Sequence, residues 1–169
     1  MELVNVVLSA ELGCQLNLHE ITRVLDNVIF APEKFSALRW NHRRISGTIL
    51  LFKTGKLVLN GCRSHVEALS SLRRYSRILM RMDYIIHLRN IKIQTMTAVY
   101  RFNTVINLSK LAEMGLMNYH PEIFPSCNIR INGIHYSLSK NGVCICTGGK
   151  NIFDINKGFY ILCKSVCVK

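Results

Sequence analysis

The sequence is poor in acidic residues. It has 10 Asp and Glu against 22 Lys and Arg, which gives a formal net charge of +12. This imbalance favours a polyanionic partner, and nucleic acid is the first candidate. An anionic membrane surface is a weaker candidate, because the basic residues are spread along the chain and do not line one long amphipathic helix.

Long apolar runs are missing as well. No stretch approaches the roughly 18 apolar residues of a transmembrane helix. The opening MELVNVVLSA has no basic segment, and its apolar stretch is too short for a secretory signal. Hydrophobic residues nevertheless make up 49% of the 169 residues and charged residues only 19%, which is typical of a chain with a packed core. We therefore expect a folded intracellular protein that does not enter a membrane.

The cysteines form no C-x-x-C pair, the spacing that many zinc and redox sites use. There are seven: Cys14, Cys62, Cys127, Cys144, Cys146, Cys163 and Cys167. The last four could in principle make a four-sulfur metal site. However, Cys144 and Cys146 are spaced as neighbours on one face of a strand, which fits packing in a core equally well. We favour reduced, buried thiols and predict no metal and no cofactor.

The two halves of the chain carry the same landmarks in the same order, 87 to 90 positions apart. The matches are Asn17-Leu18 with Asn107-Leu108, Pro32 to Phe35 with Pro121 to Phe124, Gly55 with Gly142, and Gly61 with Gly148. We therefore predict two copies of one unit, residues 1–89 and 90–169, joined intimately into one domain.

Each copy predicts the same series of elements. A strand rich in β-branched residues comes first, at 4–12 and 91–102, and a short helix capped by Asn17 or Asn107 follows. Hairpins at 50–61 and 137–148 and a final long helix complete each copy. Because hairpins require antiparallel pairing, the fold class is α+β. Two such units joined edge to edge would form one twisted sheet, with the helices on its convex face.

The first hairpin, LLFKTGKLVLNG, has two apolar faces where one is usual. Alternation along the strands places Leu50, Phe52 and Val58 on one face and Leu51, Leu57 and Leu59 on the other. The second hairpin, SLSKNGVCICTG, has Ser139 at the position of Phe52. One apolar face of the first hairpin is therefore left over for a partner.

Over nearly its whole length the chain resembles the TATA-binding protein family. The stretches that carry the resemblance are VNVVLSAELGCQLNL, APEKFSALRW, LLFKTGKLVLNGCRS, RRYSRILMRM, IKIQTM, NYHPEIFP and CTGGK. The resemblance implies a saddle: a curved ten-stranded antiparallel sheet that sits on the minor groove of DNA, with four helices on the convex face. Its function would be to bend A·T-rich promoter DNA at transcription initiation.

The resemblance also implies which residues meet DNA. Phenylalanine wedges match Phe35, Phe52 and Phe124, and the fourth wedge position falls on Ser139. The positions that face the groove match Asn5, Val7, Leu50, Val58, Asn60, Thr95, Thr97, Ser137, Ile145 and Thr147. Lys34, Arg63, Arg130 and Lys150 suit contacts with phosphates, which strengthen binding without reading the sequence.

The second copy departs from the family at three of these positions. The family's central pair of asparagines is present once, as Asn5, and is replaced once, by Thr95. Ser137 stands where the first copy has Leu50, next to the missing wedge at Ser139. If the resemblance holds for function, the second copy should deform DNA less than the first.

Two protein-binding surfaces follow from the resemblance. In the family, one segment of the second copy docks the B-type general transcription factor, which connects to RNA polymerase. Relatives use the basic face of the first long helix to bind the A-type factor and negative regulators. The matching residues are His120, Glu122 and Ile123 for the first surface and Arg74, Arg77 and Arg81 for the second. Localisation would be nuclear, or at the site of viral transcription if the source is a virus.

Two alternatives remain beside a DNA-bending initiation factor. One is an interaction scaffold of the same family in which binding to the TATA sequence is weakened or lost. The other is a basic nucleic-acid-processing enzyme, but His120 beside Glu122 has no nucleophile or metal cluster near it, so we expect no enzyme. A homodimer through the exposed apolar sheet face is also plausible without DNA.

Overall fold

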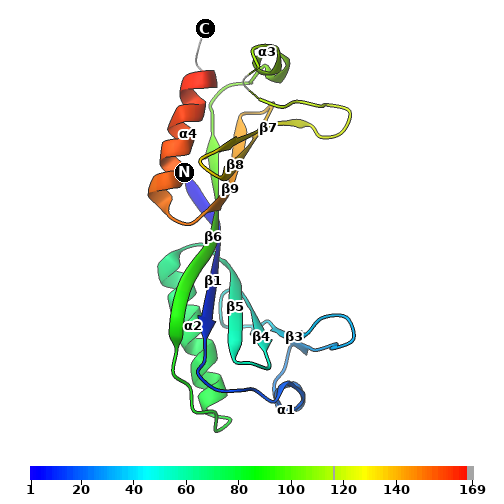
Figure 1. Cartoon of the computed structure of the whole chain (residues 1–169), viewed down its shortest axis with the longest axis vertical. Helices are drawn as coiled ribbons and strands as arrows, with labels where there is room; N and C mark the ends of the chain where they lie inside the picture. Colours follow the sequence, from blue (N-terminus) through cyan, green and yellow to red (C-terminus); the bar gives the residue numbers. More distant parts are fainter. Residues whose placement is uncertain (116, 167–169) are drawn as a thin grey trace. The chain divides into compact units, whose positions relative to one another are not determined.

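The computed structural model describes residues 1–115 and 117–166, which form nine strands and four helices (Figure 1). The strands are β1 (Glu2–Glu11), β2 (Val28–Ile29), β3 (Ala37–Trp40), β4 (Thr48–Phe52), β5 (Lys56–Cys62), β6 (Arg89–Arg101), β7 (Ser126–Ile131), β8 (Ile134–Ser139) and β9 (Val143–Gly149). The helices are α1 (Leu18–Val24), α2 (His65–Met80), α3 (Leu108–Glu113) and α4 (Ile152–Val166). The strands make one sheet in the order β2-β3-β4-β5-β1-β6-β9-β8-β7. The predicted α+β class is confirmed.

The chain divides into two compact units. The first unit comprises Asn5–Gln94, and the second comprises Met1–Val4 with Thr95–Lys169. Within the first unit α2 lies along one side of the strands, and within the second α4 does the same (Figure 1). None of the helices in the described part of the chain is both long and apolar enough to cross a membrane.

The short helices begin where the sequence predicts, because an asparagine caps each of them. The side-chain oxygen of Asn17 accepts a hydrogen bond from the backbone N–H of Glu20, at 3.3 Å. Asn107 accepts in the same way from Lys110, at 3.0 Å. Each cap satisfies one of the backbone donors that a helix start leaves without an intrahelical partner.

The core of the first unit lies between α2 and the facing side of the strands. Leu72, Tyr75 and Leu79 in α2 are fully buried, and so are Leu51 and Leu59 in β4 and β5. The Tyr75 hydroxyl donates to the carbonyl of Gly47, at 2.9 Å, and accepts from the backbone N–H of His42, at 3.2 Å. The phenol is therefore satisfied inside an otherwise apolar core.

The second unit builds its core in the same way around α4. Ile155 and Leu162 are fully buried. Phe159 stacks on Tyr100, with the ring centroids 3.6 Å apart. The Tyr136 hydroxyl donates to the carbonyl of Ile155 at 3.0 Å and thereby ties β8 to the helix.

The structure has nine strands in its described part where the family resemblance implies ten. In the first unit β2 pairs with β3 through Val28 and Ile29. The corresponding pairing in the second unit is a single bridge between Asn118 and Asn128, with N···O distances of 3.0 and 2.9 Å. Asn118 stands where the first unit has Ile29, and asparagine is a poorer strand former than isoleucine, which accounts for the shorter pairing.

Candidate nucleic-acid interface

Each unit has one sheet face that its long helix does not cover, and we call this the open face. Along β1, Val6, Leu8 and Ala10 are buried, whereas Asn5 and Val7, which alternate with them, are half-buried and point the other way. The other positions that the resemblance assigns to the groove follow the same alternation. They are Leu50 and Phe52 in β4, Val58 and Asn60 in β5, Thr95 and Thr97 in β6, Ser137 and Ser139 in β8, and Ile145 and Thr147 in β9.

The first hairpin has two apolar faces, as its sequence predicts. Leu51, Leu57 and Leu59 are at most 1% exposed, whereas Leu50 and Val58 are only half-buried. Leu50 and Val58 are direct neighbours across β4 and β5. A continuous apolar patch therefore faces solvent on the open face of the first unit.

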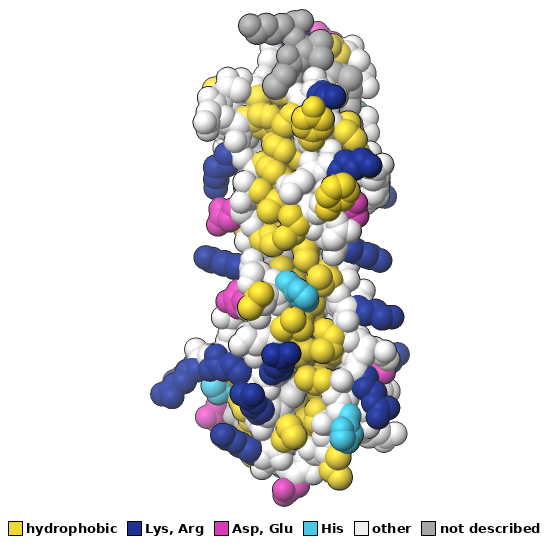
Figure 2. Space-filling model, turned by 90° about the vertical axis from the view of Figure 1, so that its left-hand side faces the viewer, with side chains coloured by type: hydrophobic (Ala, Val, Ile, Leu, Met, Phe, Trp, Pro, Cys, Tyr) yellow, Lys and Arg dark blue, Asp and Glu magenta, His cyan; other side chains and the backbone are white. Residues whose placement is uncertain are grey.

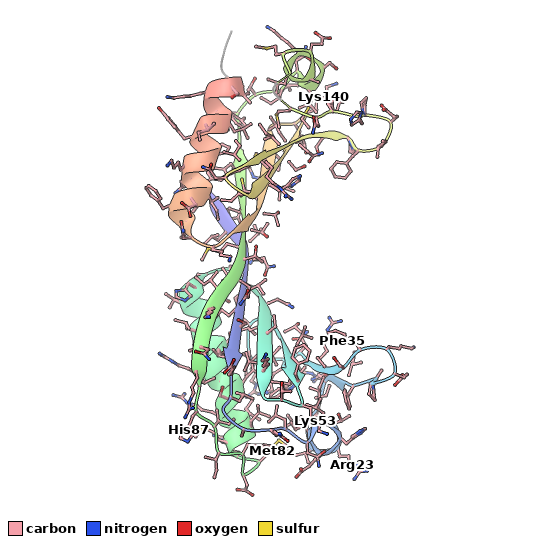
Figure 3. All side chains as sticks on the ribbon, in the orientation of Figure 1. Arg23, Phe35, Lys53, Met82, His87 and Lys140 are labelled. Carbon is pink, nitrogen blue, oxygen red and sulfur yellow. The ribbon has the colours of Figure 1, made fainter. Side chains whose placement is uncertain are left out.

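A pair of phenylalanines stands at the edge of this patch. The Phe35 side chain is 49% exposed, and its ring centroid lies 6.3 Å from that of Phe52 in an edge-to-face arrangement. Figure 3 shows Phe35 on the side of the strands away from α2. The backbone N–H groups of Lys34 and Phe35 both donate to the carbonyl of Ala31, at 2.9 Å, which holds the turn that presents the ring.

The second unit has the same turn but only one ring. The N–H groups of Ile123 and Phe124 both donate to the carbonyl of His120, at 2.9 Å, and the Phe124 side chain is 53% exposed. Ser139 occupies the place of the second ring, so no ring pair in the described part of the chain includes Phe124. Of the four positions that the resemblance assigns to wedges, the first unit therefore has an aromatic side chain at two and the second unit at one.

The two central polar positions also differ. The Asn5 side-chain oxygen accepts from the backbone N–H of Gly61, at 2.8 Å, so the amide nitrogen of Asn5 keeps its two donors for an external acceptor. In the second unit the hydroxyl of Thr95 is buried and has no hydrogen-bond partner among the described residues. The donor pair of Asn5 has no counterpart there.

The four candidate phosphate contacts, Lys34, Arg63, Arg130 and Lys150, are all exposed. Arg63 comes just before α2, and its backbone N–H donates to the Glu67 carboxylate at 2.6 Å. This hydrogen bond is the main cause that lowers the pKa of Glu67, and a hydrogen bond from the Ser46 hydroxyl is the second. Lys150 stands at the equivalent place before α4. There the Asn151 side chain accepts from the N–H of Asp154, at 2.7 Å.

Several residues of the open faces were missed in the sequence. His135 in β8, and Ser126 and Asn128 in β7, share the face of Ser137. Strand alternation counted back from Ser137 would have found His135. In the first unit a groove of about 360 Å³ beside Phe52 is partly lined by Lys56, Lys92 and Glu11, so basic side chains outnumber the acidic one there.

A more voluminous cavity lies away from these residues. It has a volume of about 780 Å³ beside α1, and its lining includes His19, Phe30, Lys53 and Tyr84. Figure 3 shows Lys53 near the turn of the first hairpin. None of the predicted DNA-contact residues lines this cavity, so the open faces and not this cavity form the candidate site.

The predicted protein-binding residues are accessible. Arg74, Arg77 and Arg81 are exposed on or just after α2, and Figure 2 shows Lys and Arg side chains around the part of the surface that α2 occupies. In the second unit His120 Nδ1 lies 3.8 Å from Glu122 Oε1 on the surface, and the neighbouring Ile123 is 79% exposed.

No cluster of three potential metal ligands exists in the part of the chain that the structure describes. Cys144 and Cys146 are fully buried on the core side of β9. A hydrogen bond with Cys144 and burial both raise the pKa of Cys146, which disfavours the thiolate that zinc requires. Cys167, the fourth member of the sulfur set considered above, lies outside the described residues.

Comparisons with known proteins agree on one family. The family described as transcription factor TFIID, or TATA-binding protein, matches residues 1–82 and 90–167. A TATA-box-binding protein-like 1 from Entamoeba histolytica is 33% identical over 159 residues, which cover 92% of this chain and 74% of that relative. A TATA-box-binding protein from Acetabularia peniculus is 29% identical over 162 residues, 94% of this chain and 85% of the relative.

Longer relatives and a solved structure match as well. TATA box-binding protein-like 2 from Rattus norvegicus is 29% identical, and the match covers 94% of this chain but only 47% of that protein. Among solved structures, the TBP of Methanococcus jannaschii matches with a TM-score of 0.88 at 26% identity. The match covers 98% of this chain and 97% of that one.

Proposed function

The chain belongs to the TATA-binding protein family, and we propose that it is a transcription-initiation factor that binds the minor groove of A·T-rich promoter DNA and bends it. The observation that carries the proposal is the exposed pair Phe35 and Phe52 beside an apolar open face. Apolar wedges of this kind unstack base steps at a cost of a few kcal/mol each, offset by the additional surface that bent DNA contacts.

The chemistry of the open face supports a preference for A·T pairs. The minor groove of an A·T pair offers only acceptors, whereas a G·C pair adds the 2-amino group of guanine. Leu50 and Val58 offer that amino group no partner, so a guanine pressed against them would lose its hydrogen bond to water. The amide of Asn5, with both donors free, suits the acceptors that A·T pairs provide.

Charge supports the same partner. A net charge of +12 makes the phosphate backbone an effective ligand. We infer that Lys34, Arg63, Arg130 and Lys150 contact phosphates and fix the protein on the duplex without reading bases. All four are exposed, and Arg63 and Lys150 stand at matching places before the two long helices.

The proposal extends to partners and location. We propose that the segment with His120, Glu122 and Ile123 docks the B-type general transcription factor. The arginines of α2 would bind the A-type factor or a negative regulator, and both surfaces would connect the bent DNA to RNA polymerase. A second copy of the chain would cover the apolar open face when DNA is absent. The protein would act in the nucleus, or at the site of viral transcription, without catalysing a reaction.

A second candidate function is a scaffold of the same family that binds DNA weakly and works through protein partners. Two observations favour it: Ser139 replaces one ring, and Thr95 leaves a buried hydroxyl without a partner. A·T-selective binding with bending separates the two candidates, because the scaffold needs neither.

The test is a titration of the whole chain onto end-labelled duplexes, one A·T-rich and one G·C-rich. Energy transfer between the labelled ends reports bending, and anisotropy reports affinity. The proposed function predicts tight, A·T-preferring binding with a clear shortening of the end-to-end distance. Weak binding that ignores sequence and leaves the duplex straight would favour the scaffold instead.

A further inference from the structure

The outer hairpin of the second unit carries small polar residues at four open-face positions where the first unit has other residue types. In the first unit the cross-strand pairs are Ala37 with Phe52 and Arg39 with Leu50. In the second unit the matching pairs are Ser126 with Ser139 and Asn128 with Ser137. We call Ser126, Asn128, Ser137 and Ser139 the serine cluster.

The change is confined to the open face. On the core face of the same strands the first unit pairs Leu38 with Leu51, and the second pairs Cys127 with Leu138. All four of these side chains are fully buried and apolar in character. Packing of the hairpin against its own helix therefore does not account for the serines, and their chemistry concerns whatever touches the open face.

The serine cluster contains hydrogen-bonding capacity that the protein does not use. Ser139 is half-buried, and its hydroxyl has no hydrogen bond within the described part of the chain. Ser126 and Ser137 share one hydrogen bond between their hydroxyls, at 2.7 Å. The Asn128 amide nitrogen donates to the carbonyl of Ser126, at 3.2 Å, while its side-chain oxygen has no partner among the described residues but is buried. Ser126 is buried as well, so the accessible acceptors of the cluster are the hydroxyls of Ser137 and Ser139.

Unused acceptors matter because of what the minor groove presents. A hydroxyl oxygen accepts as well as donates, so Ser137 and Ser139 can each receive a hydrogen from outside the protein. The only base donor in the minor groove is the 2-amino group of guanine. An apolar face leaves that group unpaired, which costs binding free energy, whereas a serine face pairs it.

We propose that the serine cluster is a specificity-determining site that accepts a hydrogen bond from the 2-amino group of guanine. The inference rests on the proposed function, because it requires the open face of the second unit to meet the minor groove. It departs from a uniform A·T preference. The DNA under the first unit must be A·T, while the end under the second unit admits or prefers G·C.

The test separates the amino group from every other property of a base pair. One terminal pair of an A·T-rich site is replaced by G·C, by inosine·C, which lacks the amino group, or by 2,6-diaminopurine·T, which carries it. The replacement is made at either end, and affinity is measured by anisotropy with the whole chain. At the end under the first unit the amino group should weaken binding by about tenfold, and at the end under the second unit by less than about twofold.

Two double variants show which unit is responsible. Ser137→Leu with Ser139→Phe gives the second unit the first unit's residues. At the end that tolerates the amino group in the natural chain, this variant should lose about tenfold in affinity when the amino group is present, and the other end should not change. The matched control, Leu50→Ser with Phe52→Ser, should remove the penalty at the opposite end. Circular dichroism and thermal melting verify that each variant folds, and Ser139→Ala tests one hydroxyl without adding bulk.

The outcomes distinguish this inference from the proposed function. Binding to A·T-rich DNA with an equal amino-group penalty at both ends would overturn the inference and leave the proposed function intact. A tolerant end that persists in the Ser137→Leu, Ser139→Phe variant would overturn it as well. Failure to prefer any A·T-rich duplex would overturn both.

Discussion

At the scale of single residues, we expect the position beside each hairpin turn to set how strongly a unit deforms DNA. Phe52 stands edge-to-face with Phe35, and such ring pairs are stabilised by about 0.5–1.5 kcal/mol beyond the area that they bury. The pair is therefore held ready before DNA arrives. Phe124 has only Ser139 in the corresponding place and lacks this support.

Phe52→Ala should reduce bending and weaken binding by about tenfold, because it removes a wedge and the support of Phe35. Ser139→Ala is the matched control, since it truncates the equivalent position, and it should leave the bend angle unchanged. Energy transfer across an end-labelled A·T-rich duplex measures both. Equal effects of the two substitutions would contradict the assignment of Phe52 as a wedge.

Ser139→Phe should increase bending, because it supplies the ring that the second unit lacks. Phe124 would gain a neighbour like the one that Phe35 has in Phe52. The same energy-transfer assay should give a shorter end-to-end distance for this variant than for the natural chain. An unchanged distance with unchanged affinity would mean that position 139 does not reach the duplex.

At the scale of elements, the start of α2 depends on a carboxylate. The Ser64 hydroxyl oxygen accepts from the N–H of Glu67, at 3.1 Å, and the Glu67 carboxylate accepts from the N–H of Arg63. Each hydrogen bond satisfies a backbone donor at the helix start, and the negative charge is favourable next to the positive end of the helix dipole.

The hydrogen bonds that the Glu67 carboxylate accepts, first from the Arg63 N–H and then from the Ser46 hydroxyl, lower its pKa in the folded protein, so they stabilise the fold above the unfolded-state pKa of about 4.3. The stabilisation should be lost as the pH falls through the lower folded pKa. Thermal melts of the natural chain and Glu67→Gln should therefore differ near neutral pH and converge in acid. Glu20→Gln is the control, because no hydrogen bond to its carboxylate occurs in the described structure.

The junction between α4 and β8 leaves no room for a side chain at Gly158. A Cβ there would overlap the hydroxyl of Tyr136, which donates to the carbonyl of Ile155. Gly158→Ala should therefore lower the free energy of unfolding by about 1–3 kcal/mol, although alanine favours a helix. In a Tyr136→Phe background, which removes the hydroxyl, the same substitution should cost less. Denaturant unfolding of the four chains measures the difference.

Most elements and both open faces follow from sequence periodicity, because a strand that buries one face must alternate. The observed alternation in β1, β4 and β8 is of this kind. Contacts between side chains on different strands were not predictable. The hydrogen bond between the Ser126 and Ser137 hydroxyls and the buried Asn128 oxygen, which has no partner among the described residues, depend on register and rotamer, which composition does not specify. The reduction of the tenth strand to one bridge depends equally on local geometry.

At the scale of the whole molecule, the excess of basic residues sets how strongly affinity depends on salt. Each phosphate contact releases condensed counterions, so the slope of log K against log salt should fall in magnitude by about 0.9 for each contact removed. Alanine substitution of Lys34, Arg63, Arg130 or Lys150, one at a time, should show this change. Arg74→Ala in α2 is the control and should keep the slope of the natural chain.

The unequal aromatic edges of the two units also imply an order in time. Dissociation of a bent duplex begins where the contact is weakest, and under the proposed function a unit with one ring would hold DNA less firmly than a unit with two. We expect the duplex to peel away from the second unit first and to leave a short-lived, half-released complex on the first. A competitor for the promoter would then displace this protein by entering at the end of the DNA that the second unit releases.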